Sequence, residues 1–382
     1  MRIILFIAAM AFGCSACSYI QLRHPLSVSA DDWNMYGGSI ARTNVSHSSI
    51  TPPLMQKWEY DASAGFSAYS AAIVDSFLFV GNLQGEVHLI NINTGKGAGN
   101  TDFGSAIIGT PVIDHDMMYV ALSQADENLI AYDLLAGKMS WRMNIGAVES
   151  SPMVIANRIY ITTYAGKLIC LEKNSGKIQW TFSVPQHSRT KVVRSSPASD
   201  GHVIVFGCDN GSLYAVDVDD GKLRWDARTG GSIVASPSVS NGKVFVGSLD
   251  NTLYAFDIGN GKELWKQPLG GKIFSSQAVD GNRVYVGTAG RNVFCLDAAG
   301  GNILWKTTTN NIVNAAPLLS GNVVYVGCID KTLYAYDATS GELLWQYTME
   351  GRIKTMPVAS KHLLFVLEED RSVVAFTHQE QR

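Results

Sequence analysis

The sequence predicts an all-β fold: an eight-bladed β-propeller of four-stranded antiparallel blades, with the ring closed by an N-terminal strand. Three observations support this prediction. An apolar block recurs eight times, a tryptophan recurs at the end of most units, and the 382 residues include 36 glycines but only 16% charged residues. This composition argues against disorder and against long solvated helices. One repeat along the whole chain indicates a single repeat architecture.

The apolar block sets the period. It reads Phe77–Val80 in the first copy and Leu363–Val366 in the last, and the eight blocks end at residues 80, 120, 161, 206, 246, 286, 326 and 366. Six of the seven steps are 40 or 41 residues long, and one step is 45 residues long. Such a period is typical of a propeller, in which each blade buries its faces against its neighbours.

Each unit carries signals for four short strands. In the fifth unit the apolar block is followed by a second strand at Thr252–Asp257, a turn at Gly259–Lys262 and a short strand that ends in tryptophan. A further apolar strand follows a proline such as Pro237 and completes the unit. The runs are β-branched and aromatic and are bounded by Gly, Asn and Asp. Forty residues leave no room for a crossover helix, so antiparallel pairing is expected.

The two ends of the repeat predict how the ring closes. The last unit ends at Val373–Phe376 and lacks the turn and tryptophan strand of the other units. The missing strand matches Lys57–Tyr60, which precedes the first complete unit. We therefore expect Trp58 to lie within one strand of Val374, which removes an exposed sheet edge.

Seven of the eight tryptophans occupy the end-of-unit position. A large ring that offers its N–H to a backbone carbonyl is expected to wedge between neighbouring blades. These residues are Trp58, Trp141, Trp180, Trp225, Trp265, Trp305 and Trp345. The first complete unit has Gly99 at this position, which predicts a looser contact between the first and second blades.

The first residues look like a bacterial lipoprotein signal. Ile3–Phe12 is an apolar run too short to span a bilayer, and the sequence Gly-Cys-Ser-Ala-Cys-Ser follows it. Small residues before a cysteine resemble a lipobox, with Cys14 and Cys17 as alternative lipid attachment sites. Serine follows either cysteine, which by the sorting rule of enteric lipoproteins implies the periplasmic face of the outer membrane. The alternative is a soluble secreted protein cleaved nearby.

These signals divide the chain into three parts. We expect a signal peptide over 1–16, a tether and leader segment over 17–53, and the propeller over 54–382. Trp33, Met35 and Tyr36 are too apolar for a solvent-exposed tether, so this part of the leader is expected to pack against the ring. The dozen residues before them are expected to be a spacer from the lipid.

Neither the charge nor the motifs indicate nucleic-acid binding or catalysis. The net charge of −3 provides no basic surface, so no nucleic-acid partner is expected. The histidines lack metal-ligand spacing, and no hydrolase, zinc-protease or P-loop motif is present. The remaining cysteines occupy repeat positions in or after strands, which predicts small buried thiols rather than disulfides. They are Cys170, Cys208, Cys295 and Cys328.

The unit ends Asp257–Trp265 and Asp337–Trp345 resemble the tryptophan-docking repeat of the pyrroloquinoline-quinone (PQQ) propeller superfamily. The resemblance covers about residues 54–378. One branch of the superfamily comprises quinoprotein dehydrogenases, which show adjacent cysteines over the cofactor, calcium ligands and a catalytic aspartate. Here no two cysteines are adjacent, and the acidic stretch Asp217–Gly221 aligns with the ordinary turn of other units. No catalytic residue, metal or cofactor is therefore predicted.

The other branch, lipoproteins resembling BamB, implies a partner-binding site. In that branch a blade-entry loop with aliphatic residues followed by arginine docks the barrel-assembly partner. The 45-residue step places Arg189, Lys191, Val192, Val193 and Arg194 in such a loop, at a rim where propellers carry binding loops. The next blade's loop reads Gly230–Val234 in place of the acidic pair of that branch.

The sequence thus predicts a non-catalytic, lipid-anchored outer-membrane scaffold that binds protein partners, with a BamB-like role in outer-membrane protein assembly. The enzyme alternative is a small PQQ-dependent quinoprotein. A further alternative is a ligand- or polysaccharide-binding propeller with Tyr69 or Tyr164 at the funnel mouth. That last alternative rests on fold analogy alone.

Overall fold

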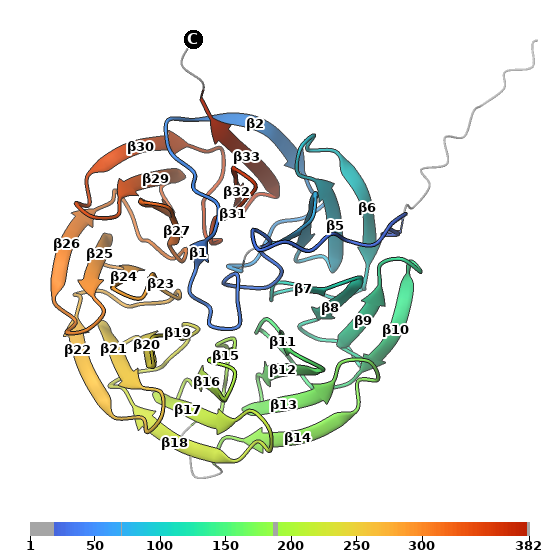
Figure 1. The fold of residues 1–382 in the computed structure, drawn as a ribbon, viewed down its shortest axis with the longest axis horizontal. Helices are drawn as coiled ribbons and strands as arrows, with labels where there is room; N and C mark the ends of the chain where they lie inside the picture. Colours follow the sequence, from blue (N-terminus) through green and yellow to red (C-terminus); the bar gives the residue numbers. More distant parts are fainter. Residues whose placement is uncertain (1–18, 70, 186–189, 380–382) are drawn as a thin grey trace, which may run out of the picture.

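The computed structural model describes residues 19–69, 71–185 and 190–379. Eight sheets surround a central hub, as Figure 1 shows, so the predicted eight-bladed propeller of four-stranded antiparallel blades is confirmed. In the described part of the chain, no helix has the length and apolar character that a membrane-spanning helix needs.

The first four blades follow the sequence from the inside of the ring outward. Blade 1 contains β3 (Ala72–Val74), β4 (Phe77–Gly81), β5 (Glu86–Asn91) and β6 (Gly97–Asp102). Blade 2 contains β7 (Val112–Asp114), β8 (Met117–Ala121), β9 (Leu129–Asp133) and β10 (Lys138–Met143). Blade 3 contains β11 (Met153–Ile155), β12 (Arg158–Thr163), β13 (Lys167–Glu172) and β14 (Ile178–Ser183). Blade 4 contains β15 (Ala198–Ser199), β16 (Val203–Gly207), β17 (Ser212–Asp217) and β18 (Leu223–Arg228).

The remaining blades repeat the pattern until the chain ends. Blade 5 contains β19 (Ser238–Ser240), β20 (Lys243–Gly247), β21 (Thr252–Asp257) and β22 (Glu263–Pro268). Blade 6 contains β23 (Ala278–Val279), β24 (Arg283–Gly287), β25 (Asn292–Asp297) and β26 (Ile303–Thr308). Blade 7 contains β27 (Leu318–Ser320), β28 (Val323–Gly327), β29 (Thr332–Asp337) and β30 (Leu343–Thr348), and β1 (Val45–Ser46) pairs in parallel with β27. Blade 8 contains β31 (Val358–Ser360), β32 (Leu363–Leu367), β33 (Ser372–His378) and β2 (Leu54–Asp61).

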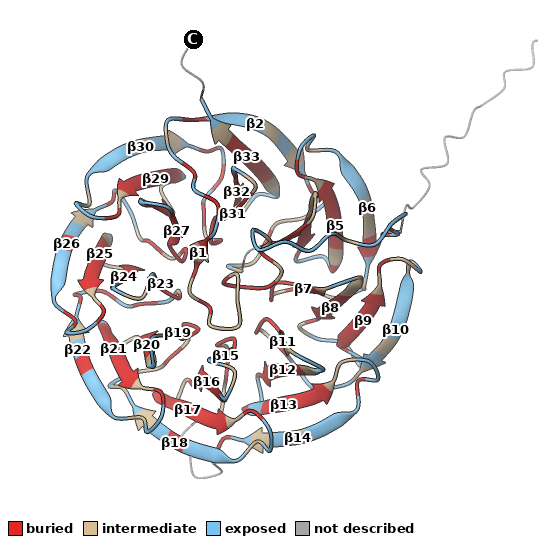
Figure 2. Ribbon diagram, in the orientation of Figure 1, coloured by how far each residue is buried: buried red, intermediate tan, exposed pale blue. Residues whose placement is uncertain are grey.

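The strand order gives the ring two distinct faces and an outer wall. We call the end with the hairpins β3–β4 and β5–β6 and their equivalents the turn face, and the end with the β4–β5 hairpins and blade-to-blade connections the loop face. The fourth strands form the outer wall, where most side chains are exposed, whereas the second and third strands are buried (Figure 2). The core therefore lies between neighbouring blades, as expected for a radial repeat.

The N-terminal strand closes the ring as predicted. β2 pairs antiparallel with β33, with Trp58 opposite Ala375 and Glu59 opposite Val374. The outermost strand of blade 8 thus comes from the N-terminal side of the chain, and it covers the edge of β33 that would otherwise be exposed.

The tryptophans at the unit ends lie between blades, where each packs on the next blade's turn. In the fifth blade's turn, Gly261 has a φ of 72°, and a Cβ there would lie 2.6 Å from the Trp225 ring. Five indole N–H groups donate to a carbonyl in that turn. These bonds are Trp58 to Ile92 (2.8 Å), Trp141 to Lys173 (2.9 Å), Trp225 to Ile258 (2.7 Å), Trp265 to Ala298 (3.1 Å) and Trp305 to Ala338 (3.0 Å).

Two tryptophans depart from this pattern. The indole N–H of Trp180 has no partner, because the equivalent carbonyl, that of Val218, accepts from the Tyr160 hydroxyl (3.1 Å) and from Arg158 (3.2 Å). The last blade lacks the docking turn, and Trp345 packs against Phe376 with ring centroids 5.9 Å apart.

The junction of blades 1 and 2, where Gly99 replaces tryptophan, is occupied by the start of the described chain. Ile20 and Leu22 are buried between the two blades, and the Leu22 N–H donates to Leu134 O (2.7 Å), the carbonyl equivalent to those that accept indole N–H groups. A Cβ at Gly137 would meet Gln21 at 3.0 Å, as other turn glycines would meet tryptophan. The predicted loosening is thus offset in part, and a cavity of about 380 Å³ remains between residues 21–26 and blade 1.

Beyond this junction the leader runs over the turn face into the hub (Figure 1). Trp33, Met35 and Tyr36 are buried, and the leader backbone binds inner strands of successive blades. These bonds pair Trp33 with Ile73, Asn34 with Ile113, Ile40 with Ser199, Ala41 with Val239, Thr43 with Val279 and Asn44 with Leu319. The expected spacer is corrected here: Ile20 and Leu22 are buried because they fill the place of the missing tryptophan.

Candidate functional site

The 45-residue step corresponds to the connection from β14 to β15, on the loop face between blades 3 and 4. Of the predicted binding residues, Arg189 lies outside the described residues, as do the two lipobox cysteines, Cys14 and Cys17. Lys191, Val192 and Arg194 are partly exposed. Val193 is an exception to the prediction: its side chain has no exposed surface and packs in the core of blades 2 to 4, so it anchors the loop and is not available to a partner.

Arg194 is the centre of a charged cluster built from three blades. Its guanidinium lies 3.1 Å from Asp209 in the β16–β17 loop and 3.5 Å from Glu149 in the connection between blades 2 and 3. It also lies over the ring of Tyr164, 5.9 Å from the centroid, while its side chain remains 40% exposed. The exposed remainder of the guanidinium can still bind a further acceptor.

Hydrogen bonds hold the backbone of this loop over residues 192–195. Tyr69 donates its hydroxyl to Arg194 O (3.0 Å), and Thr162 donates to Ser195 O (2.7 Å). From the neighbouring β16–β17 loop, the Asp209 N–H donates to Val192 O (2.9 Å). A binding loop fixed in this way loses little conformational freedom on association.

The electrostatics of the cluster combine burial with ion pairing. Burial raises the pKa of the Asp209 carboxyl, and the neighbouring Arg194 opposes that rise. The hydrogen bond with Tyr164 raises the pKa of Arg194, as do the charges of Asp209 and Glu149, while burial acts in the other direction. Two carboxylates, the Arg194 guanidinium and the nearby Lys191 give a surface of mixed charge, which suits a partner carrying both hydrogen-bond donors and acceptors.

A hollow beside the cluster adds shape to this surface. Its volume is about 300 Å³, and it shares Glu149 and Tyr164 with the Arg194 cluster. The other lining residues come from blades 2 and 3 and are Ile108, Ser123, Gln124, Ala147 and Val148. The lining mixes apolar and polar side chains, so the hollow can take a partner side chain that carries both.

The same ion pair recurs four blades away, which provides an internal reference. Lys354 and Glu369, on the loop face of blade 8, occupy the positions equivalent to Arg194 and Asp209, and they also form an ion pair. Lys354 has 37% of its side chain exposed, close to Arg194. The two sites differ in that Arg194 also contacts Tyr164 and Glu149.

In the hub, where quinoproteins of this superfamily would hold their cofactor, the residues that the structure describes leave a small cavity. Leader residue Arg42 is fully buried there and donates to the carbonyls of Pro152 and Pro197, each at 3.0 Å. The remaining cavity measures about 70 Å³, enough for a few waters but below the roughly 300 Å³ of small-molecule pockets. Its ten lining residues include Tyr36, Tyr69 and Asn314 and carry no charge. These ten residues offer neither the space nor the positive charge that PQQ, a tricyclic quinone with three carboxylates, requires.

Among the described residues, the arrangement nearest to a catalytic set lies at the junction of blades 8 and 1. His88 Nε2 contacts Ser63 Oγ (3.2 Å) and Glu86 (3.3 Å), and His88 Nδ1 contacts the Tyr60 hydroxyl (3.0 Å). Glu86 also accepts from the amide of Asn82 (2.9 Å). The Ser63 hydroxyl donates to the Glu86 carboxylate, so the Ser–His–carboxylate order of a nucleophilic triad is not formed. Burial lowers the pKa of His88.

The four cysteines of the blades are buried and free, as predicted. Burial raises the pKa of each thiol, to about 11 for Cys170, Cys208 and Cys328 and about 12 for Cys295. Among the residues that the structure describes, no group of three His, Cys, Asp or Glu side chains is placed to hold a metal ion.

The partners of Arg194 were not identified from the sequence. Glu149, Tyr164 and Asp209 come from separate units, and Tyr164 entered the prediction only as a funnel-mouth aromatic. One signal was available: aligned on the repeat, position 209 is acidic, as is 369, whereas 249, 289 and 329 are Leu, Ala and Ile. Tyr69 is partly buried beside Tyr36, with ring centroids 5.0 Å apart, and it both supports the loop and lines the hub cavity.

Residues 55–152, 125–194, 186–273 and 250–380 match the profile of the family described as outer membrane protein assembly factor BamB. The chain belongs to this family. The BamB of Salmonella typhimurium is 27% identical over 190 residues, which cover 48% of this chain and 47% of that protein. The matched region thus spans about half the length of this curated relative.

Solved structures confirm the fold. The crystal structure of BamB from Moraxella catarrhalis superposes with a TM-score of 0.73 at 18% identity and covers 85% of this chain and 99% of that chain. The quinohemoprotein alcohol dehydrogenase of Comamonas testosteroni superposes with a TM-score of 0.72 at 15% identity, covering 92% and 81% of the two chains. At these identities the BamB and dehydrogenase structures share the propeller, and the superposition does not choose between their functions.

Proposed function

We propose that this protein is a non-catalytic, periplasm-facing outer-membrane lipoprotein that takes part in outer-membrane protein assembly by binding protein partners on its loop face. The observation that carries the proposal is the match to the BamB family along residues 55–380. The packing of the hub also supports a non-catalytic role. Leader residues such as Arg42 occupy the place where a quinone would bind, and the cavity that the described residues line there measures about 70 Å³.

The lipid in this proposal is attached at Cys14 or Cys17, after cleavage of the signal peptide (within 1–16) directly before the lipidated cysteine. The anchor confines encounters with partners to the membrane surface and so raises their effective concentration. The blades supply rigidity, because a rim loop held at Arg194 O and Val192 O presents its side chains in a fixed geometry.

The proposed contact surface is the Arg194 cluster with its hollow. Lys191, Val192 and Arg194 form its ridge, and Tyr164 and Glu149 border the hollow. Arg189 belongs to the proposed loop by sequence. The partner class is a protein of the outer-membrane assembly machinery, with no nucleic acid and no cofactor involved.

The test is photo-crosslinking of the intact lipoprotein in its native envelope, with a photoreactive residue in place of Val192. We expect capture of an outer-membrane assembly protein, and at least a fivefold loss of that product in Arg194→Glu, because the reversed charge faces Asp209 and Glu149. The matched control is Lys354→Glu, an equivalent ion pair four blades away, which should leave capture unchanged. Equal losses in both variants, or capture of no assembly protein, would reject this surface.

A further inference from the structure

The first described residues fix the chain to one place on the ring. The Ile20 N–H donates to Thr101 Oγ1 of β6 (3.1 Å), and Ile20 O accepts from the Tyr132 hydroxyl of β9 (2.8 Å). Gln21 Nε2 donates to Leu135 O (3.1 Å), and Ile20 itself is fully buried. The chain is therefore held by blade 1 on one side and blade 2 on the other.

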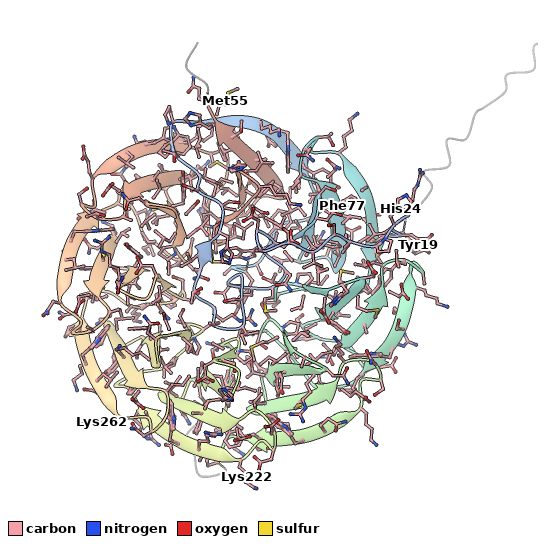
Figure 3. All side chains as sticks on the ribbon, in the orientation of Figure 1. Tyr19, His24, Met55, Phe77, Lys222 and Lys262 are labelled. Carbon is pink, nitrogen blue, oxygen red and sulfur yellow. The ribbon has the colours of Figure 1, made fainter. Side chains whose placement is uncertain are left out.

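The direction of this segment places its start on the outer wall. It runs from Thr101, near the loop-face end of β6, to Leu134 in the β9–β10 turn at the turn face. Tyr19 precedes it and is 68% exposed. Figure 3 shows Tyr19 and His24 at the ring's outer edge, on the side opposite Lys262.

Covalent geometry limits how far a lipid can lie from this point. At about 3.6 Å per residue, a lipidated Cys17 lies within roughly 11 Å of Ile20, and a lipidated Cys14 within roughly 22 Å. A domain of this size is on the order of 50 Å across. A tether this short keeps this wall close to the bilayer, and it excludes any orientation in which only the opposite wall of the ring touches the membrane.

We propose that the outer wall at the junction of blades 1 and 2, around Tyr19 and β10, is the surface that faces the lipid bilayer, so that the propeller stands on edge. The inference rests on the proposed lipid attachment. The exposed Tyr19 suits the membrane interface, where an amphipathic aromatic ring is favourable. The loop face with Arg194 is then perpendicular to the bilayer and open to periplasmic partners.

The outer wall on the opposite side of the ring is equally apolar at the equivalent position. This provides a matched pair of positions for a test. Met139 in β10 of blade 2 is 48% exposed, and the equivalent Ile303 in β26 of blade 6 is 42% exposed. Blades 2 and 6 lie on opposite sides of the ring (Figure 1). The two positions thus match in apolar exposure, and the linker variant described below separates the tether from the difference in charge between β10 and β26.

The test uses the full lipidated chain in vesicles of phosphatidylethanolamine and phosphatidylglycerol. Met139→Cys and Ile303→Cys are each labelled with a fluorescent maleimide, since the four blade thiols are buried, and the unsubstituted protein corrects for other labelling. Nitroxide-headgroup lipids should quench the label at 139 at least twofold more than the label at 303. Equal quenching, or stronger quenching at 303, would overturn the proposal.

A second variant tests whether the tether is the cause. A ten-residue Gly/Ser linker inserted between Ser18 and Tyr19 adds an average reach of about 17 Å and leaves Ile20–Leu22 in place. The quenching difference should then disappear, and its persistence would refute the tether as its source. If mass spectrometry finds no acyl chain and the protein fails to float with vesicles, both this inference and the proposed anchor fail. Flotation without a quenching difference rejects the orientation alone.

Discussion

Two arcs of the ring fill the space between neighbouring blades in different ways. In the regular arc, blades 4 to 7, each unit repeats every 40 residues, and the junctions inside the arc are wedged by Trp225, Trp265 and Trp305, each 8% exposed and hydrogen-bonded. In the entry arc, blades 8, 1 and 2, the wedge at one junction is Ile20–Leu22, and the outer strand of blade 8 comes from the N-terminal side.

The comparison shows what the junction requires. In both arcs an apolar group fills the space between blades, and an N–H donates to the carbonyl of the residue that follows the strand. An indole supplies both in the regular arc, whereas at the junction of blades 1 and 2 in the entry arc side chains and a backbone N–H supply them separately. The entry arc therefore gains its closure from segments outside the repeat, and its stability depends on the leader.

The largest effect is expected in the regular arc, for Trp265→Ala. This change removes a ring with 8% exposure and its bond to Ala298 O, and should cost about 3–5 kcal/mol of unfolding free energy. Urea unfolding followed by fluorescence measures it. Leu264→Ala, a neighbour 41% exposed, should change stability by less than about 0.5 kcal/mol. A loss under about 1 kcal/mol for Trp265→Ala would show that the wedge is dispensable.

A smaller but local effect is expected for Ile20→Ala in the entry arc. Truncating this fully buried side chain should cost about 2–4 kcal/mol. Amide exchange should accelerate in β6 and β9 and remain unchanged in β21 and β25, because repeat units contact only their neighbours. Tyr19→Ala, at 68% exposure, is the control and should have almost no effect. Unchanged exchange in β6 and β9 would mean that the leader does not function as a wedge.

The fold was predictable because its determinants repeat. Eight apolar blocks and a recurring tryptophan specify blade number and strand order, and the missing outer strand identifies Trp58 as the closing residue. Ile20–Leu22 could not be placed, since a three-residue segment has no periodicity and its partners, Thr101 and Leu134, lie 81 and 112 residues further along. The Arg194 cluster could not be predicted either, because its members are also far apart in the sequence. Its loop was found from a period change, whereas Glu149 and Asp209 become neighbours only when the blades assemble.

The smallest effect concerns a buried carboxyl at the edge of the entry arc. Glu368 in blade 8 is 2% exposed, at a position where the regular arc carries neutral Ser248, Thr288 and Cys328. Burial raises the pKa of Glu368 from 4.5 to about 7, Asp370 adds to the rise, and the bond from the Gly351 N–H (2.8 Å) opposes it.

The sign of the resulting pH dependence follows from this shift. The folded protein holds the Glu368 proton more tightly than the unfolded chain does, so the stability it contributes is complete below pH 4.5 and is lost as pH rises through about 7. Between pH 6 and 8 the loss should be about 1 kcal/mol. Glu368→Gln should remove this slope and be more stable than the parent protein at pH 8. Glu369→Gln, which changes the carboxylate paired with Lys354, should keep the slope. A parallel pair of stability curves for Glu368→Gln and the parent would show that Glu368 is not the titrating group.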